Sequence, residues 1–174
     1  MELFYINSQE FLHTHDLDFL KSYLEGRSFK SEKRLVEFAL GRFLVKTAAE
    51  KFYGIKDTAI VINNSKPEFE HGGLHFSITH SAGVVMAVFD KKPCGIDLEV
   101  MKPRDFKLLS ARYDKCLTTA EEFYSFWTEL EAGIKLQMPV RGKFTRRFQD
   151  KFMLTVVSSE AISSPPSCTN LPVS

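Results

Sequence analysis

The sequence contains only three cysteines, Cys94, Cys116 and Cys168, and they lie far apart in the chain. An odd number at these spacings argues against a disulfide framework and against a CxxC metal knuckle, so we expect reduced thiols. No apolar run approaches the length needed to cross a bilayer. The start of the chain lacks the basic segment, apolar stretch and cleavage site of a secretory signal. We therefore expect a cytoplasmic protein without a membrane partner.

A strong excess of charge is missing as well, because 23 Lys and Arg oppose 22 Asp and Glu and leave a net charge of +1. This balance gives no general attraction for nucleic acid, so we expect no such partner, and any anion site must come from local clusters of cations. Two clusters exist, at residues 27–34 and 141–151. A Gly-rich phosphate loop of the GxxxxGK type is absent.

What the sequence has is a large apolar fraction, 44% with 16 Phe, which is enough to bury a core in 174 residues. Residues 31–53 have a helical pattern between a Ser31 N-cap and Gly54 at the C-terminal end. The stretch 76–99 predicts three short strands, and residues 152–157 predict a closing strand. The basic residues around Gly142 predict a loop. Residues 159–174, rich in Ser and Pro, predict a poorly ordered extension.

A second long helix is predicted from a capping box at Thr118 or Thr119 to about Leu136. Its apolar residues have helical spacing and predict a continuous stripe on the core. Glu131 and Lys135 fall on the border of that stripe, one turn apart. An exposed helix pair is the alternative reading of these two residues. The stripe consists of Phe123, Phe126, Trp127, Leu130 and Ile134.

Two carboxylates, Asp97 and Glu99, stand two residues apart on the third predicted strand and therefore project from the same face. A solvated strand end is one interpretation. The other is a divalent cation between them, and oxygen ligands favour Mg²⁺. With Glu131 as a third carboxylate, the set predicts a magnesium site, and Lys135 could hold a phosphate oxygen beside it. No Ser or Cys has a clear activating neighbour, so the nucleophile could belong to a second substrate.

Four segments in this order resemble the 4′-phosphopantetheinyl transferase superfamily, surfactin type, across about residues 34–135. They are Lys66-Pro67, HFSITHS at 75–81, GIDLE at 95–99 and FWTELEAGIK at 126–135. The resemblance implies an α/β (α+β) fold of two pseudo-symmetric lobes, about 1–90 and 91–158, each a small, mostly antiparallel sheet packed with a long helix. It also implies a monomer.

The resemblance further implies transfer of the 4′-phosphopantetheine arm of coenzyme A to a serine of an acyl or peptidyl carrier protein. The reaction releases adenosine 3′,5′-bisphosphate and depends on Mg²⁺, as in a holo-[acyl-carrier-protein] synthase of fatty acid biosynthesis. By motif match, Asp97, Glu99 and Glu131 are metal ligands and Glu131 is the general base. Lys135 neutralises the α- or β-phosphate of the coenzyme as the bond breaks. The implied contacts with the nucleotide and its 3′-phosphate come from His80, Thr79, Lys66, Arg34 and Lys30.

Two departures from the family pattern keep other functions open. Leu130 stands where a Lys is common, and Ser65 stands where a Gly usually precedes Lys-Pro. A non-catalytic module that binds coenzyme A or a carrier protein is therefore the first alternative, and a magnesium phosphohydrolase is the second. The basic residues 141–151 are either a solvated loop or a docking patch for an acidic carrier.

Overall fold

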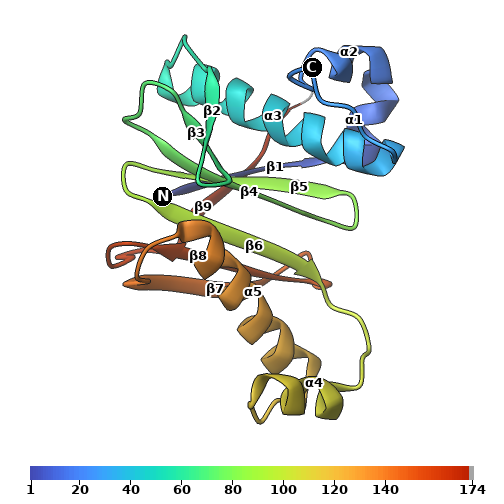
Figure 1. The fold of residues 1–174 in the computed structure, drawn as a ribbon, viewed down its shortest axis with the longest axis vertical. Helices are drawn as coiled ribbons and strands as arrows, with labels where there is room; N and C mark the ends of the chain where they lie inside the picture. Colours follow the sequence, from blue (N-terminus) through green and yellow to red (C-terminus); the bar gives the residue numbers. More distant parts are fainter. Residues whose placement is uncertain (173–174) are drawn as a thin grey trace.

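The computed structural model describes residues 1–172, and in it two sheets lie between two long helices (Figure 1). The first lobe has a four-stranded sheet of order β4-β5-β1-β9 with α3 on its outer side, and the second lobe has a three-stranded sheet of order β6-β8-β7 with α5 against it. The strands are β1 (Glu2–Asn7), β2 (Ile60–Asn63), β3 (Lys66–Phe69), β4 (His75–Ser81), β5 (Val84–Asp90), β6 (Cys94–Val100), β7 (Gly142–Phe148), β8 (Phe152–Ser158) and β9 (Ser167–Asn170). The helices are α1 (Ser8–Thr14), α2 (Leu17–Lys21), α3 (Glu32–Tyr53), α4 (Phe106–Tyr113) and α5 (Ala120–Leu136). The predicted α+β class is confirmed.

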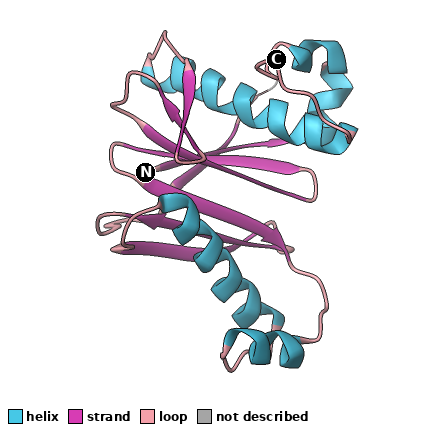
Figure 2. Cartoon of the chain, viewed as in Figure 1, coloured by secondary structure: helices cyan, strands magenta, loops and turns pink. Residues whose placement is uncertain are grey.

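The elements near the site form where the local signals of the sequence predict them (Figure 2). Helix α3 ends at Gly54, whose φ of 66° is the left-handed conformation that glycine adopts without strain. Helix α5 begins with a capping box between Thr119 and Glu122, the second of the two predicted. The turn between β2 and β3 has Asn64 and Ser65 in the left-handed region. These ends fix where each strand and helix reaches the junction of the lobes.

Two large apolar layers lie within the four-layered arrangement, and smaller apolar clusters lie between α5 and the second sheet. One lies between α3 and the first sheet and contains Leu40, Leu44 and Phe76. The other lies between the two sheets, where Met86 and Val88 of the first sheet pack with Ile96 and other residues of the second. Because both faces of the first sheet are covered, strand β5 is buried along almost its whole length.

Two segments differ from their sequence predictions. Residues around Gly142 form strand β7, which pairs in antiparallel register with β8 along its whole length. Its side chains Lys143 and Arg147 make ion pairs with Glu129 and Glu121 of α5. Two of the basic side chains in the segment predicted as a loop are therefore paired with acidic residues on the surface of the second lobe.

The tail predicted to be poorly ordered contains β9, which pairs in parallel with β1 at the free edge of the first sheet. Leu171 is fully buried in the layer under α3, so this segment contributes apolar area to the first lobe. The prediction for the tail is wrong for these residues, and residues 173–174 lie outside the described part of the chain.

The predicted apolar stripe of α5 is buried only in part: Phe123 is 4% exposed and Trp127 packs in the same cluster, but the C-terminal part of the stripe is exposed. Leu130 and Ile134 are 38% and 60% exposed, whereas Tyr124, Thr128 and Ala132 face the second sheet. The reason is a close approach of the helix to β6: a Cβ on Gly95 would lie 2.2 Å from the Ala132 carbonyl oxygen. Small residues permit this distance and the larger apolar ones do not.

Candidate functional site

Strand β6 carries the two carboxylates at the junction of the lobes. Asp97 and Glu99 point to one side, while Ile96 and Leu98 point into the layer between the sheets. Asp97 is only 6% exposed, and Glu99 is half-buried. A buried carboxylate needs partners, because an uncompensated charge away from water is costly.

Asp97 has partners from both lobes. Its Oδ1 accepts a hydrogen bond from Thr79 Oγ1 of β4 at 3.1 Å and pairs with Lys135 Nζ of α5 at 2.7 Å. Lys135 Nζ also donates to the Ile96 carbonyl oxygen at 3.0 Å. The other oxygen, Asp97 Oδ2, is buried and has no hydrogen-bond partner among the described residues. This orphaned acceptor is a position where a cation would be stabilised.

Glu99 is held by a similar contact, since its Oε2 accepts a hydrogen bond from Ser81 Oγ at 3.2 Å. Burial and the neighbouring Asp97 raise the pKa of Glu99 above its ordinary value. Hydrogen bonds from Ser81 and Trp127, together with the charge of Lys135, act in the opposite direction. Trp127 is thus both part of the apolar cluster beside α4 and a wall of the site.

The structure does not bring Glu131 together with the other two carboxylates. Within residues 1–172, no group of three His, Cys, Asp or Glu side chains is arranged to hold a metal ion. Asp97 and Glu99, with the orphaned Oδ2, fit a hard divalent cation by their oxygen chemistry. The role of Glu131 as a third ligand stays a prediction. Lys135, which the sequence placed beside a phosphate or in a pair with Glu131, instead contacts Asp97.

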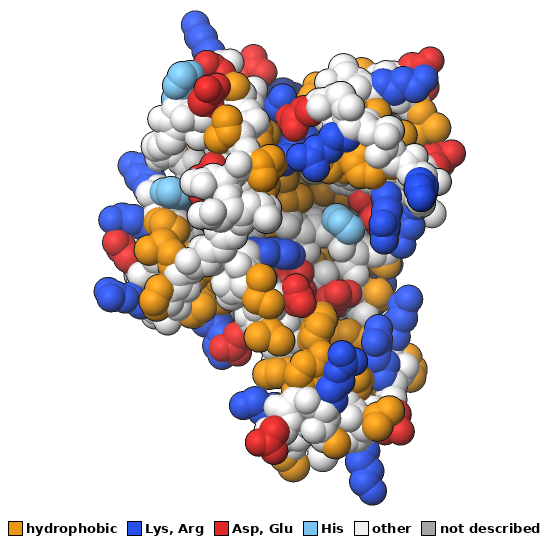
Figure 3. All heavy atoms as spheres, in the orientation of Figure 1, with side chains coloured by type: hydrophobic (Ala, Val, Ile, Leu, Met, Phe, Trp, Pro, Cys, Tyr) orange, Lys and Arg blue, Asp and Glu red, His pale blue; other side chains and the backbone are white. Residues whose placement is uncertain are grey.

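A cavity of about 600 Å³ lies next to these residues, between the face of α3, the β2–β3 hairpin and the end of β4. In Figure 3 the middle of this face is hollowed, with basic, acidic and His side chains around the hollow. Arg34 and His80, both predicted to meet the nucleotide, line the cavity. The electrostatic and aromatic character of this cavity suits an anionic, ring-containing ligand.

Sequence reasoning missed several lining residues. The guanidinium groups of Arg27 and Arg42 lie 5.1 Å and 4.9 Å from the centre of the Phe38 ring. Arg42 is buried and is fixed by Glu25, with Nε 3.0 Å from Oε2. The basic cluster at 27–34 pointed toward this region, but Arg42 and Phe38 fall within an apolar helical pattern that gave no separate signal.

Glu37 is another lining residue that the sequence did not single out. Its Oε2 lies 3.4 Å from His80 Nδ1, and its Oε1 lies 3.7 Å from Lys33 Nζ. Burial lowers the pKa of His80, and the nearby Glu37 carboxylate partly counteracts that shift. A buried acid therefore stands beside the histidine that the motifs place at the 3′-phosphate.

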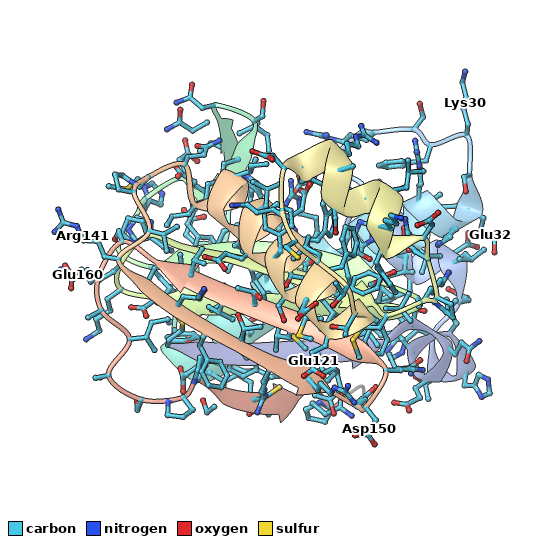
Figure 4. The ribbon with its side chains drawn as sticks, turned by 90° about the horizontal axis from the view of Figure 1, so that it is seen from below. Lys30, Glu32, Glu121, Arg141, Asp150 and Glu160 are labelled. Atoms are coloured by element: carbon cyan, nitrogen blue, oxygen red, sulfur yellow. The ribbon has the colours of Figure 1, made fainter. Side chains whose placement is uncertain are left out.

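The other predicted nucleotide contacts lie elsewhere. Lys66 is buried, donates to the Cys94 carbonyl oxygen at 3.3 Å, and lines an adjoining cavity of about 310 Å³ together with Lys135. Thr79 is 3% exposed and hydrogen-bonded to Asp97. Lys30 is exposed, projects from the body of the protein in Figure 4, and does not line the larger cavity.

Comparison with known proteins identifies relatives of a single kind. A 4′-phosphopantetheinyl transferase of Bacillus subtilis is 31% identical over 132 residues, which cover 64% of this chain and 58% of the relative. The 4′-phosphopantetheinyl transferase psf-1 of Bacillus pumilus is 31% identical over 111 residues, 56% of this chain and 48% of the relative. The 4′-phosphopantetheinyl transferase Sfp of Bacillus subtilis (strain 168) is 30% identical over 91 residues, 44% of this chain and 41% of the relative. The chain spans about half the length of these curated relatives. No family model matches it.

Proposed function

Because its sequence relatives are 4′-phosphopantetheinyl transferases of the predicted surfactin type, we propose that this chain transfers the 4′-phosphopantetheine arm of coenzyme A to a carrier-protein serine. The serine oxygen forms a bond to the phosphorus next to the pantetheine. The bond from that phosphorus to the bridging oxygen breaks, and adenosine 3′,5′-bisphosphate leaves. Acyl or peptidyl carrier proteins and coenzyme A are thus the proposed partners.

The observation that carries this proposal is the adjacency of an acidic cluster and a cationic cavity. The carboxylates of Asp97 and Glu99, with Lys135 beside them, lie at the lobe junction, and the cavity lined by Arg34 and His80 opens next to them. A nearly neutral protein can bind a polyanionic nucleotide where its cations are concentrated in this way. The adjoining cavity is lined by Lys66 and Lys135. The diphosphate would bind there, between the acidic cluster and the larger cavity.

Each residue has a role in the proposed reaction. Asp97 and Glu99 would hold Mg²⁺, and the resemblance adds Glu131 as a third ligand; the ion would neutralise charge on the diphosphate. Glu131, half-buried on α5, accepts the proton of the attacking serine hydroxyl. Lys135 stabilises the charge that develops on the bridging oxygen. His80 and Arg34 bind the nucleotide end.

One assay tests the proposal: purified protein, coenzyme A, Mg²⁺ and an apo carrier protein, followed by intact mass. We expect the carrier to gain one phosphopantetheine. Glu131→Gln should abolish the gain while circular dichroism stays unchanged. Glu129→Gln, a change of the same size two residues away in a surface pair with Lys143, should leave it intact. Full transfer by Glu131→Gln would refute the role of that residue.

A non-catalytic module that binds coenzyme A is the second candidate, favoured by the separation of Glu131 from the other two carboxylates. Leu130, at the position where the family pattern has Lys, is partly exposed and brings no cation to the site. In the same assay this candidate predicts retention of coenzyme A on the protein without a mass gain on the carrier. Hydrolysis of coenzyme A without a carrier would instead indicate a phosphohydrolase.

The finer assignments follow from the resemblance. We propose a monomeric cytoplasmic enzyme with the holo-[acyl-carrier-protein] synthase reaction of fatty acid biosynthesis. Among the described residues, no helix is long and apolar enough to span a membrane. His80→Ala should raise the KM for coenzyme A more than it lowers kcat, because the side chain contacts the nucleotide end and not the reacting phosphorus.

A further inference from the structure

Strands β4 and β6 lie side by side where the lobes meet, yet they belong to different sheets (Figure 1). The backbone hydrogen bonds of β6 on one edge go to β8. On the edge that faces β4, its N–H groups have no strand ladder, and buried N–H groups need acceptors. Three side-chain hydroxyls of β4 accept these hydrogens. The bonds run from Ile96 N to Ser77 Oγ (3.3 Å), from Leu98 N to Thr79 Oγ1 (3.1 Å) and from Val100 N to Ser81 Oγ (3.0 Å).

The three hydroxyls differ in where their own hydrogen goes. Each hydroxyl has one hydrogen to donate. Thr79 donates it to Asp97 Oδ1 at 3.1 Å, and Ser81 donates it to Glu99 Oε2 at 3.2 Å. Ser77 accepts the Ile96 N–H, and the residue before Ile96 is Gly95. Asp97 and Glu99 hold the corresponding positions before Leu98 and Val100, so Ser77 alone has no neighbouring carboxylate. Ser77 therefore makes the same contact with the backbone of β6 without a contact to an acid.

The hydroxyl of Thr79 has no hydrogen left for a ligand. Its single hydrogen is used by Asp97, and its oxygen already accepts the Leu98 N–H. The residue is 3% exposed, so its side chain has almost no surface for a ligand. A hydrogen bond from this hydroxyl to a nucleotide phosphate would require breaking the bond to Asp97.

We propose that Thr79 and Ser81 are positioning residues that fix the carboxylates of Asp97 and Glu99 for a divalent cation, and that Ser77 only joins the lobes. The proposal rests on the proposed function. Donated hydrogen bonds favour the ionised carboxylate and restrict its rotation. At Asp97, Thr79 and Lys135 both occupy Oδ1, which leaves Oδ2 as the oxygen free for the cation.

Three variants separate positioning from simple attachment of the lobes. Thr79→Val keeps the shape and removes the hydroxyl, Ser81→Ala removes the second hydroxyl, and Ser77→Ala is the matched control that removes an N–H acceptor alone. The probe is Mn²⁺, measured by the electron paramagnetic resonance signal of the free ion, with and without coenzyme A. Thermal unfolding without metal reports the structural part.

All three variants should unfold at a lower temperature, because each loses one acceptor for a β6 N–H. Thr79→Val and Ser81→Ala should also bind Mn²⁺ about tenfold more weakly, the usual effect of removing an outer partner of a metal ligand. Ser77→Ala should bind Mn²⁺ like the wild type. Thr79→Ser, which restores the hydroxyl, should restore Mn²⁺ binding. If Thr79→Val does not fold, Ser81→Ala against Ser77→Ala decides the question.

Unchanged Mn²⁺ binding in Thr79→Val and Ser81→Ala would overturn the inference and leave the proposed transfer standing. Weaker binding of coenzyme A by Thr79→Val without a change in Mn²⁺ affinity would also overturn it, in favour of a phosphate contact. Failure of the wild type to bind Mn²⁺ would remove the cation to be positioned and refute the inference. Intact Mn²⁺ binding with the expected variant pattern, but no transfer to the carrier, would refute the function alone.

Discussion

The two long helices are attached to their sheets in opposite ways. Helix α3 covers the first sheet with large apolar side chains, including Leu40 and Leu44, which are fully buried. Helix α5 covers the second sheet with Thr128 and Ala132, and its backbone approaches β6 at Gly95. The first lobe thus depends mainly on buried apolar area. The second lobe combines smaller apolar clusters, which contain Phe123, Tyr124 and Leu136 of α5, with a close backbone contact.

The difference explains how a charged side chain of the second helix reaches the carboxylate of β6. The close contact at Gly95 lets the Lys135 side chain reach the Ile96 carbonyl and Asp97 across the interface. A layer of Leu side chains, as under α3, would hold the helix farther from the strand. Short distance rather than apolar area is therefore what brings the functional groups of α5 and β6 together.

The largest loss of stability is expected when one methyl group is added to β6 at its contact with α5. Gly95→Ala would place a Cβ 2.2 Å from the Ala132 carbonyl oxygen and 3.0 Å from the Leu136 backbone nitrogen, and neither can move without α5. We expect a loss of about 3 kcal/mol or more in the free energy of unfolding, measured by urea denaturation, with loss of transfer activity.

The matched change in the first lobe is Gly41→Ala in α3, where the new Cβ would lie 3.2 Å from Cγ2 of the Ile78 side chain. A shift of a few tenths of an ångström by the partly exposed Ile78 side chain relieves this contact, and Ala favours a helix over Gly by about 1 kcal/mol. We expect a change within about 1 kcal/mol of zero. Equal losses for the two variants would show that the helices do not differ in this respect.

The second prediction tests the first lobe by removing apolar volume. Leu44→Ala should lower the free energy of unfolding by about 3 kcal/mol, because the layer between α3 and the sheet cannot close over the space. Urea denaturation measures it. A loss below about 1 kcal/mol would mean that this layer contributes less than its burial indicates.

A smaller effect is expected from the polar contact under α5. Thr128 Oγ1 lies 2.7 Å from Thr155 Oγ1, which in turn lies 2.9 Å from Thr145 Oγ1. Thr128→Val removes the first hydroxyl and keeps the shape, while Thr155 retains Thr145 as a partner. We expect a loss of about 1 kcal/mol by thermal unfolding. A more stable variant would show that apolar packing could replace this contact.

The smallest effect concerns Glu99 and depends on pH. The pKa of Glu99 in the folded protein is raised above its ordinary value of 4.5. At a pH between the ordinary pKa and the folded-state pKa, the folded protein therefore binds more protons than the unfolded one. The free energy of unfolding therefore falls as pH rises through this window, and Glu99→Gln removes that decrease. We expect the variant to be more stable than the wild type at pH 7, by up to about 1 kcal/mol. The gain should vanish as pH falls toward the ordinary pKa of Glu.

Thermal unfolding of both proteins across this pH range checks the sign. A variant less stable than the wild type at neutral pH would mean that the contacts of Glu99 with Ser81 and Trp127 outweigh burial and the repulsion by Asp97.

The sequence predicted the elements whose start and stop signals are local. Helix α3 was bounded by Ser31 and Gly54, and β6 by its period-two pattern, which also placed Asp97 and Glu99 on one face. The orientation of α5 was not predictable in this way. Its large apolar residues suggested one stripe, but the deciding contact is made by Gly95, a residue of another strand whose spatial position no helical pattern contains.

The site was predictable to a similar degree. Two of the three carboxylates and Lys135 come together because β6 and α5 are adjacent. Glu37 and Arg42 were missed because α3 carries them among apolar residues, and their burial follows from the hairpin and the neighbouring Glu25. Lys66 was expected at the nucleotide, yet its bond to the Cys94 carbonyl depends on how the two lobes meet.

Strand β9 has a consequence for the order in which the protein can fold during synthesis. Strand β1 has β5 on one side, but its other neighbour is β9, which leaves the ribosome only after the whole second lobe. Until then β1 exposes a row of unpaired backbone groups that can bind a strand from another nascent chain. Most of the first sheet is thus translated early but completed late, and one of its edges stays open during that interval.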